Sequence, residues 1–276
     1  MRSSATREPS VLTELAAGVF VLQIDGPIPV NAGIVIGDEH VAVIDSGTIE
    51  ADARLILDAV ARVTDLPVRY VVNTHHHGDH SFGNWWFLPA LVVGHERCRV
   101  RLVGEAGTSH RDGFARMLPM VAEQIEAVPV TPPEVTFEQR LLLHLGRVSL
   151  RLDYFGRAHT DNDIAIAVQE RDIVFAGDLI EQSAPPVAVE AFTAEWGPTL
   201  RRLEAVPEAR FVPGHGVAVD RAFVAMQAEA FEQVTAACAA AGSPDAAFEA
   251  LPAEARSVLG QQARTAVDRY YATIDA

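Results

Sequence analysis

Lysine does not occur among the 276 residues, so all 22 basic side chains are arginine. Against them stand 37 aspartate and glutamate side chains, which gives a formal net charge of −15. A surface this acidic would repel a phosphate backbone, so we predict that nucleic acid is not a partner. The remaining composition, with 49% hydrophobic and 21% charged residues, is typical of a globular protein with a large core.

Cysteine is nearly absent as well. Cys98 and Cys238 are the only two, which is too few for a disulfide framework, and neither lies in a spacing typical of a metal site. We therefore expect both to be buried thiols of a protein in a reducing compartment.

Hydrophobic runs of membrane-spanning length are missing, because no stretch approaches about 18 consecutive apolar residues. Residues 1–18 carry Arg2, Arg7 and Glu8 and contain no apolar run of signal-peptide length. We therefore predict a cytoplasmic protein without membrane association. Internal repeats, low-complexity tracts and interdomain linkers are absent too, so we expect a single domain over residues 1–276, with a helical C-terminal region over about 219–276.

The hydrophobic pattern predicts a mixed α/β protein. Short β-branched runs predict strands at 19–24, 33–37, 41–45, 68–72, 141–143, 148–152, 164–168, 173–175 and 211–212. Helical spacing of apolar residues predicts helices at 49–63, 96–103, 108–128, 196–206 and 220–241, with a helical tail after 244. Strands followed by helices, twice over, fit two packed sheets with helices on both outer faces.

A dense group of metal-ligand residues follows the predicted strand 68–72. His75, His77, Asp79 and His80 form the pattern H-x-H-x-D-H. With ten histidines in the chain, three at these spacings should arise by chance in roughly one of a hundred such chains. Zinc accepts imidazole nitrogen and carboxylate oxygen. The first two histidines can face one metal, and Asp79 with His80 can face a second.

Four ligands do not complete two zinc sites, so further ligands are expected downstream. Three places offer them. His159 lies between two predicted strands, and Asp178 directly follows the strand 173–175 in Ala-Gly-Asp. His215 lies in Pro-Gly-His-Gly, where flanking glycines allow the backbone to approach a metal closely.

The order of these motifs, from H-x-H-x-D-H to Pro-Gly-His-Gly, resembles the metallo-β-lactamase superfamily from about residue 18 to 220. The resemblance implies an α/β fold, the four-layer αβ/βα sandwich of that superfamily, with the metals at one edge. It also implies two zinc sites with a shared ligand: His75, His77 and His159 for the first zinc, Asp79, His80 and His215 for the second, and Asp178 bridging both.

Such a site predicts a dinuclear zinc-dependent hydrolase. Two zinc ions about 3.5–4 Å apart would lower the pKa of a bridging water, so that hydroxide attacks the substrate near neutral pH. Asp79 is the predicted catalytic residue, because it is placed to orient this nucleophile and to carry a proton. No serine or cysteine nucleophile is required. We expect a small-molecule substrate with an ester, thioester, lactone or lactam bond.

The substrate itself stays open among several alternatives. A β-lactamase-like lactam hydrolase fits less well, because Asp178 replaces the cysteine that many such enzymes carry and no lysine is available to anchor the drug's carboxylate. The bridging aspartate resembles that of glyoxalase II, but the set of Lys and Arg that grips glutathione there has no clear counterpart. Lactonases and esterases share the ligand set, and a di-metal phosphodiesterase is a further alternative. The tRNA-processing endonucleases also share these ligands, but their protruding basic arm has no counterpart in this sequence.

Other functions rank below a hydrolase. A di-iron oxidoreductase of the related group would carry Glu at the position of His77 and a flavin domain after it. An inactive metal-binding protein would not need an intact ligand set. The ligands alone would also suit Fe or Mn. The sequence leaves the metal in the cell and the oligomeric state open.

Several neighbouring residues allow two interpretations. Asp45 resembles a first-strand aspartate of the superfamily that supports a metal-binding histidine, and a turn-forming role is an equal alternative. His76 is interpreted as structural or as a support for the ligands. Trp85 and Trp86 could line a pocket or pack in the core, and residues 108–133 could form a helical lid. The histidines without ligand spacing are expected at the surface or in the core: His40, His95, His110 and His144.

Overall fold

The computed structural model describes residues 10–274, which fall into two compact units. The first unit comprises the residues up to Thr136 together with His144–Val148, and the second comprises Phe137–Leu143 and the residues from Ser149 onward. Of the N-terminal stretch 1–18, in which the sequence predicts no signal peptide, residues 1–9 lie outside the described residues. The single domain over 1–276 stays a prediction.

The first unit contains a seven-stranded sheet in the order β1-β2-β3-β4-β5-β6-β7. Strands β1 to β4 pair antiparallel, whereas β4, β5 and β6 run parallel. The strands are β1 (Val11–Ala16), β2 (Val19–Ile24), β3 (Val30–Ile36), β4 (Val41–Ile44), β5 (Val68–Val72), β6 (Leu91–His95) and β7 (Val135–Phe137). The parallel strands β4 and β5 matter most for the site, because their carboxyl ends lie at the same edge of the sheet.

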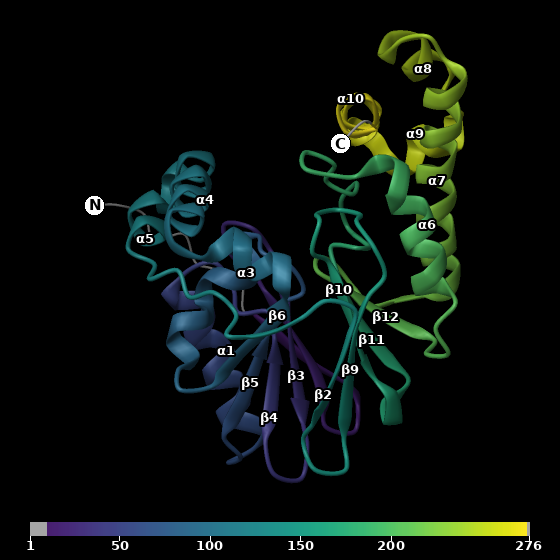
Figure 1. Cartoon of the computed structure of the whole chain (residues 1–276). Coiled ribbons are helices and arrows are strands. Elements are labelled where there is room, and N and C mark those ends of the chain that lie inside the picture. Colours follow the sequence, from purple (N-terminus) through teal and green to yellow (C-terminus); the bar gives the residue numbers. More distant parts are fainter. Residues whose placement is uncertain (1–9, 275–276) are drawn as a thin grey trace. The chain divides into compact units, whose positions relative to one another are not determined.

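Helix α1 (Glu50–Val63) joins β4 to β5 and covers one face of this sheet (Figure 1). Its apolar residues repeat with helical spacing, so Ala53, Ile56 and Val60 are buried in one cluster with strand residues such as Ile34 and Val43. The other helical segments of the unit are α2 (Gly78–Ser81), η1 (Phe82–Phe87), α3 (Glu96–Leu102), α4 (Gly104–Met117), η2 (Pro119–Val121) and α5 (Ala122–Glu126). Residues 108–128, which the sequence predicts as one helix, form helical segments interrupted near Pro119, which cannot continue a helix.

The second unit contains a six-stranded sheet in the order β13-β12-β11-β10-β9-β8. Strands β11 and β12 pair in parallel, whereas β9 with β10, β10 with β11, and β12 with β13 pair antiparallel. The strands are β8 (Arg140–His144), β9 (Ser149–Tyr154), β10 (Ile164–Val168), β11 (Ile173–Gly177), β12 (Arg210–Pro213) and β13 (Val219–Asp220). The end of β11, the end of β12 and the start of β10 therefore lie at one edge.

Helices α6 (Thr193–Glu204) and α7 (Arg221–Ala240) lie side by side on this second sheet (Figure 1). Trp196 of α6 stacks on Phe231 of α7 with ring centroids 4.1 Å apart, and both are buried in one cluster with Val174 and Phe211 of the sheet. The remaining helical segments are η3 (Gln169–Arg171), α8 (Pro244–Ala250), α9 (Ala253–Leu259), η4 (Gly260–Gln262) and α10 (Ala263–Thr273). Two sheets with helices make the mixed α/β fold that the sequence predicts.

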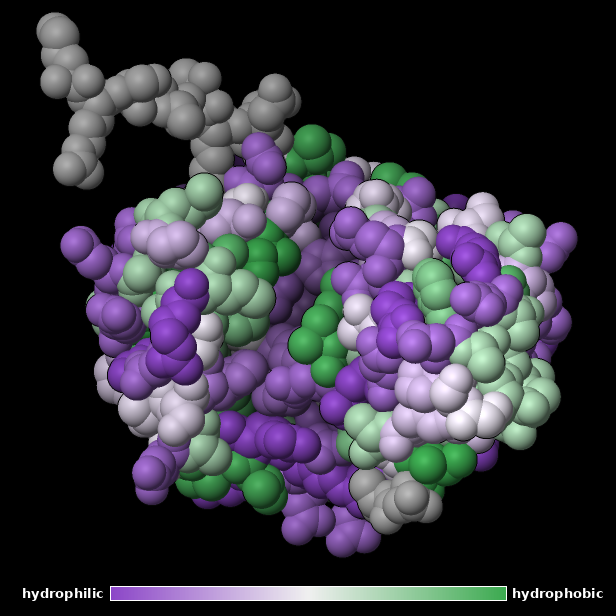
Figure 2. Space-filling view, turned by 90° about the horizontal axis from the view of Figure 1, so that it is seen from above, coloured by the Kyte–Doolittle hydropathy of each residue, from purple (hydrophilic) through white to green (hydrophobic). Residues whose placement is uncertain are grey.

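Both cysteines are buried, as predicted. Burial raises the pKa of the Cys238 thiol to about 11, so it stays protonated at neutral pH. Among the described residues, no helix combines the length and the apolar character that crossing a bilayer requires. On the face shown in Figure 2, hydrophobic residues occur in small groups among hydrophilic ones.

Candidate metal centre

In the first unit, the parallel strands β4 and β5 bring their following residues together. Asp45 comes directly after β4, and Thr74 and His75 follow β5. The Asp45 carboxylate accepts hydrogen bonds from the backbone N–H and the hydroxyl of Thr74, both at 2.8 Å. The Thr74 hydroxyl oxygen in turn lies 3.1 Å from His75 Nδ1. The hydroxyl proton is already donated to Asp45, so Nδ1–H of His75 is the donor in this contact.

The run from His75 to His80 folds back on itself through a tight helical turn. His77 precedes α2, and Asp79 and His80 lie within it. Ser81 stabilises the turn, because its hydroxyl contacts the carbonyls of His76 and His77, each at 2.9 Å. The ring centroids of His75 and His77 are 4.7 Å apart, and those of His75 and His80 are 4.3 Å apart. The turn therefore gathers the predicted ligands of this unit in a small volume.

A glycine is required inside this turn. A Cβ atom added to Gly78 would lie 2.5 Å from the ring of Phe82 and 3.0 Å from that of Phe114. The two aromatic rings contact each other edge to face, with centroids 5.5 Å apart. Helix α4, which carries Phe114, thus packs directly on the ligand turn.

Asp45 also fixes the orientation of His80. Its Oδ2 atom accepts a hydrogen bond from His80 Nδ1 at 2.8 Å, and His80 Nε2 lies 3.3 Å from Asp79 Oδ2. All three side chains are buried. Burial raises the pKa of the Asp45 carboxyl above its ordinary value, while His80 and the two donors of Thr74 counteract this rise. Of the two interpretations left open by the sequence, the structure supports the one in which Asp45 supports a histidine.

In the second unit, three chain segments meet at the edge formed by β10, β11 and β12. Asp178 directly follows β11, His215 follows β12, and His159 lies in the loop that leads into β10. Asp163 closes that loop, because its carboxylate accepts hydrogen bonds from the backbone N–H of Thr160 at 2.7 Å and from the Thr160 hydroxyl at 2.8 Å.

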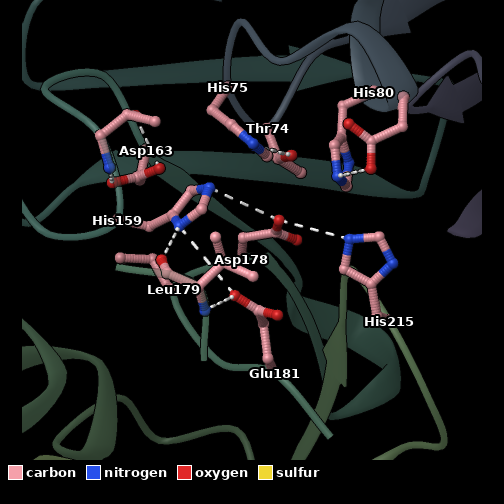
Figure 3. A network of polar contacts seen from close by, with 12 residues as sticks. Thr74, His75, His80, His159, Asp163, Asp178, Leu179, Glu181 and His215 are labelled. Carbon is pink, nitrogen blue, oxygen red and sulfur yellow. Dashed lines mark hydrogen bonds and ion pairs between the residues drawn. The ribbon is translucent and has the colours of Figure 1, made fainter. Parts of the chain in front are cut away.

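Asp178 lies between the two histidines of this unit (Figure 3). Its Oδ2 atom is 3.6 Å from Nε2 of His159 and 3.3 Å from Nε2 of His215. On the other side of the His159 ring, Nδ1 is 2.9 Å from the carbonyl oxygen of Val187 and 4.0 Å from Oε1 of Glu181. One oxygen of Asp178 thus faces the Nε2 atom of both imidazole rings.

The donor set fits a divalent metal. In His75, His80 and His159, Nδ1 contacts an oxygen atom, which directs Nε2 to the opposite side of the ring. Histidines that bind metals usually hold their second nitrogen in this way. Imidazole nitrogens together with the carboxylates Asp79 and Asp178 are ligands that zinc accepts. The ligand atoms of His75 and His77 lie within 4.8 Å of each other, as do those of Asp79 and His80.

Some residues near the ligands could not be found from sequence spacing. His110 of α4 was expected at the surface or in the core, yet its ring stacks on that of His77 with centroids 5.9 Å apart and lies 4.9 Å from that of His76. Trp196 contacts His159 edge to face at 5.8 Å. His110 and Trp196 lie near the proposed ligands because helices α4 and α6 pack next to them. The local sequence carries no signal for this packing.

The other residues whose role the sequence left undecided lie in the core or at the surface. His95 is buried and its Nδ1 accepts from the backbone of Arg97 at the start of α3. His144 is exposed. Trp85 is 49% exposed, whereas Trp86 packs partly buried against the core. Core packing thus accounts for Trp86.

Comparison with known proteins identifies the family. The family model of the metallo-β-lactamase superfamily matches residues 25–215. The type 2 metallo-β-lactamase of Bacteroides fragilis is 25% identical over 199 residues, which are 69% of this chain and 70% of that protein.

Solved structures agree in fold. A metallo-β-lactamase from Pontibacter korlensis superposes with a TM-score of 0.66 at 19% identity, over 81% of this chain and 99% of that one. The metallo-β-lactamase FIM-1 from Pseudomonas aeruginosa, in its mono-zinc form, gives a TM-score of 0.64 at 20% identity, over 83% and 97%. These comparisons support a hydrolase with a metal cofactor, and the chain belongs to the metallo-β-lactamase superfamily.

Proposed function

We propose that this protein is a dinuclear zinc hydrolase that cleaves a small ester, thioester, lactone or lactam. The observation that carries the proposal is the orientation of the histidines: Nδ1 of His75, His80 and His159 contacts oxygen, and Nε2 of His80 and His159 faces a carboxylate. The proposed ligands are His75, His77 and His159 for one zinc, Asp79, His80 and His215 for the other, and Asp178 for both.

When bound, zinc supplies a water of lowered pKa and a Lewis acid for the scissile carbonyl. The protein's part is to place and orient the reacting groups. Asp79 is buried, and its Oδ2 atom is held 3.3 Å from His80 Nε2, so it can orient the attacking water and hold its proton. Asp45 keeps His80 in one tautomer by accepting from Nδ1, which leaves Nε2 as the ligand atom.

Two arginines in the segments around the second unit's ligands bear on the charge of the substrate. Arg157 lies two residues before His159, and its guanidinium pairs with Glu195. Arg269 donates to the backbone carbonyls of Glu190 and Ala191, both at 3.1 Å. Both guanidiniums are engaged within the protein, so neither is available to pair with a carboxylate or phosphate of the substrate.

The loop after Asp178 offers an apolar surface. Val187 and Val189 are 37% and 62% exposed, and the carbonyl of Val187 contacts His159. Both side chains carry no charge and lie in the segment that directly supports a proposed ligand. This favours an apolar group next to the bond that is cleaved.

A β-lactamase-like lactam hydrolase, whose substrate carries a carboxylate, is the second candidate, since the relative from Bacteroides fragilis bears the name metallo-β-lactamase. A substrate panel separates the two. With the zinc-loaded protein, kcat/KM should be highest for uncharged lactones, thioesters and aryl esters. It should be at least about tenfold lower, or about 1.4 kcal/mol, for the anionic lactam nitrocefin and for a phosphodiester, because neither Arg157 nor Arg269 is available to pair with their negative charge.

The protein stripped with a chelator is the control for this panel, and it should be inactive on every substrate. Hydrolysis of the phosphodiester alone would contradict the proposed substrate class, and a preference for nitrocefin would favour the second candidate. Hydrolysis that persists unchanged without metal would contradict the metal-dependent reaction itself.

A further inference from the structure

Helix α7 lies outside the residues 25–215 that match the family model, yet one of its side chains contacts the segment that follows Asp178. Gln227 is 1% exposed. Its Oε1 atom accepts a hydrogen bond from the backbone N–H of Glu181 at 3.2 Å, and its Nε2 atom donates to the carbonyl of Leu179 at 3.0 Å. One buried amide therefore holds two backbone groups of the turn directly behind Asp178.

A second buried side chain contacts the same carbonyl. The indole Nε1 of Trp196 donates to the oxygen of Leu179 at 3.0 Å. The ring of Trp196 contacts His159 edge to face and stacks on Phe231 of α7. Helices α6 and α7 thus each donate one side-chain hydrogen bond to the carbonyl of Leu179, which directly follows the proposed metal ligand Asp178.

The turn held by Gln227 is linked to both histidines that are proposed ligands in this unit, and Figure 3 shows Glu181 of this turn beside His159. The Glu181 carboxylate accepts from the backbone N–H of Val187 at 2.7 Å, and the carbonyl of Val187 accepts from His159 Nδ1 at 2.9 Å. The backbone N–H of Gln182 donates to the carbonyl of His215 at 3.1 Å. A shift of this turn would therefore move both histidines as well as Asp178.

We propose that Gln227 is a positioning residue for the metal ligands His159, Asp178 and His215, acting through the turn 179–181. The proposal rests on the proposed function, because it assigns a role toward the bound metal. With the amide in place, both polar groups of the turn have fixed partners. Without it, a buried N–H loses its acceptor, and the turn must rearrange to satisfy it. Because the ligands move with the turn, the cost appears in metal affinity.

The variant Gln227→Met tests the proposal, because methionine has a similar volume and neither donates nor accepts the two hydrogen bonds. The dissociation constant for zinc, measured on the folded protein by competition with a chromogenic chelator, should rise about tenfold. The matched control is Gln233→Met on the same helix. Gln233 contacts the exposed Glu229, so the control should bind zinc like the wild type.

Zinc affinity separates positioning from a purely structural role. A structural role would lower the unfolding midpoint of Gln227→Met and leave the zinc affinity of the folded protein unchanged, which would overturn the proposal. If this variant does not fold, Gln227→Asn keeps a polar amide but shortens the side chain by one methylene, so it does not reach both backbone groups; zinc binding should weaken about fivefold. A folded Gln227→Asn protein with wild-type affinity would also overturn the proposal. A wild type that binds no zinc overturns the proposed function and this proposal together, whereas a zinc-binding wild type with an unaffected variant overturns this proposal alone.

Discussion

The variant Asp178→Ala should lose nearly all hydrolytic activity while keeping the fold. One oxygen of Asp178 lies 3.3 Å from His215 Nε2 and 3.6 Å from His159 Nε2, so it is the carboxylate at the centre of the second unit's ligands. Its removal leaves two imidazoles without the negative charge that balances a bound dication. We expect kcat/KM to fall at least about 1000-fold, which corresponds to roughly 4 kcal/mol of lost stabilisation.

The fold should survive, because the Asp178 carboxylate is buried and its removal relieves a desolvation cost in the metal-free protein. Zinc titration and circular dichroism measure the two effects separately. Asp245→Ala is the matched control: Asp245 lies in the same unit, its side chain is 81% exposed, and it pairs with Arg264 at the surface. An Asp178→Ala protein that binds zinc as tightly as the control would contradict the assigned role.

The variant Asp45→Ala should lower both zinc affinity and stability. The Asp45 carboxylate accepts three hydrogen bonds, two from Thr74 and one from His80. Alanine would leave these buried donors without their acceptor, which should destabilise the metal-free protein by about 3 kcal/mol. Because His80 would lose the partner that fixes its tautomer, zinc affinity should fall about 10- to 100-fold. Urea denaturation and zinc competition measure the two losses.

The variant Asp45→Asn separates these two effects. Asp45 has φ of 61°, a left-handed conformation that asparagine adopts at least as readily as aspartate. The asparagine variant should therefore keep more stability than the alanine variant. It should still bind zinc more weakly than the wild type, because a neutral amide supports the His80 ring less well than a carboxylate. Equal zinc binding by the wild type and both variants would show that Asp45 only shapes the turn.

The proposed ligands were accessible from sequence because they follow predicted strands at fixed spacing. His75 comes three residues after β5, and Asp178 comes directly after β11. The parallel pairs β4–β5 and β11–β12 then place the residues after each pair at one edge. The hydrophobic pattern of a strand and the residues at its end are local features, so they could be predicted from a single sequence.

Other features depend on tertiary contacts and were not predicted. Strand β1 is largely exposed, so its hydrophobic pattern is weak, and β6 is a short buried strand that contains Gly94. Gln227 lies 49 residues after Asp178, on a helix whose sequence pattern shows only an amphipathic face. It reaches the turn 179–181 only because that helix packs there. His110 reaches His77 in the same way, through helix α4.

The zinc content of the purified chain tests the central claim most directly. Elemental analysis of the wild type, as purified and after dialysis with zinc, should give two zinc ions per chain. Removal of the zinc with a chelator should abolish ester or lactone hydrolysis, and added zinc should restore it. A chain that is purified without metal, binds no added zinc and gains no hydrolytic activity would contradict the account.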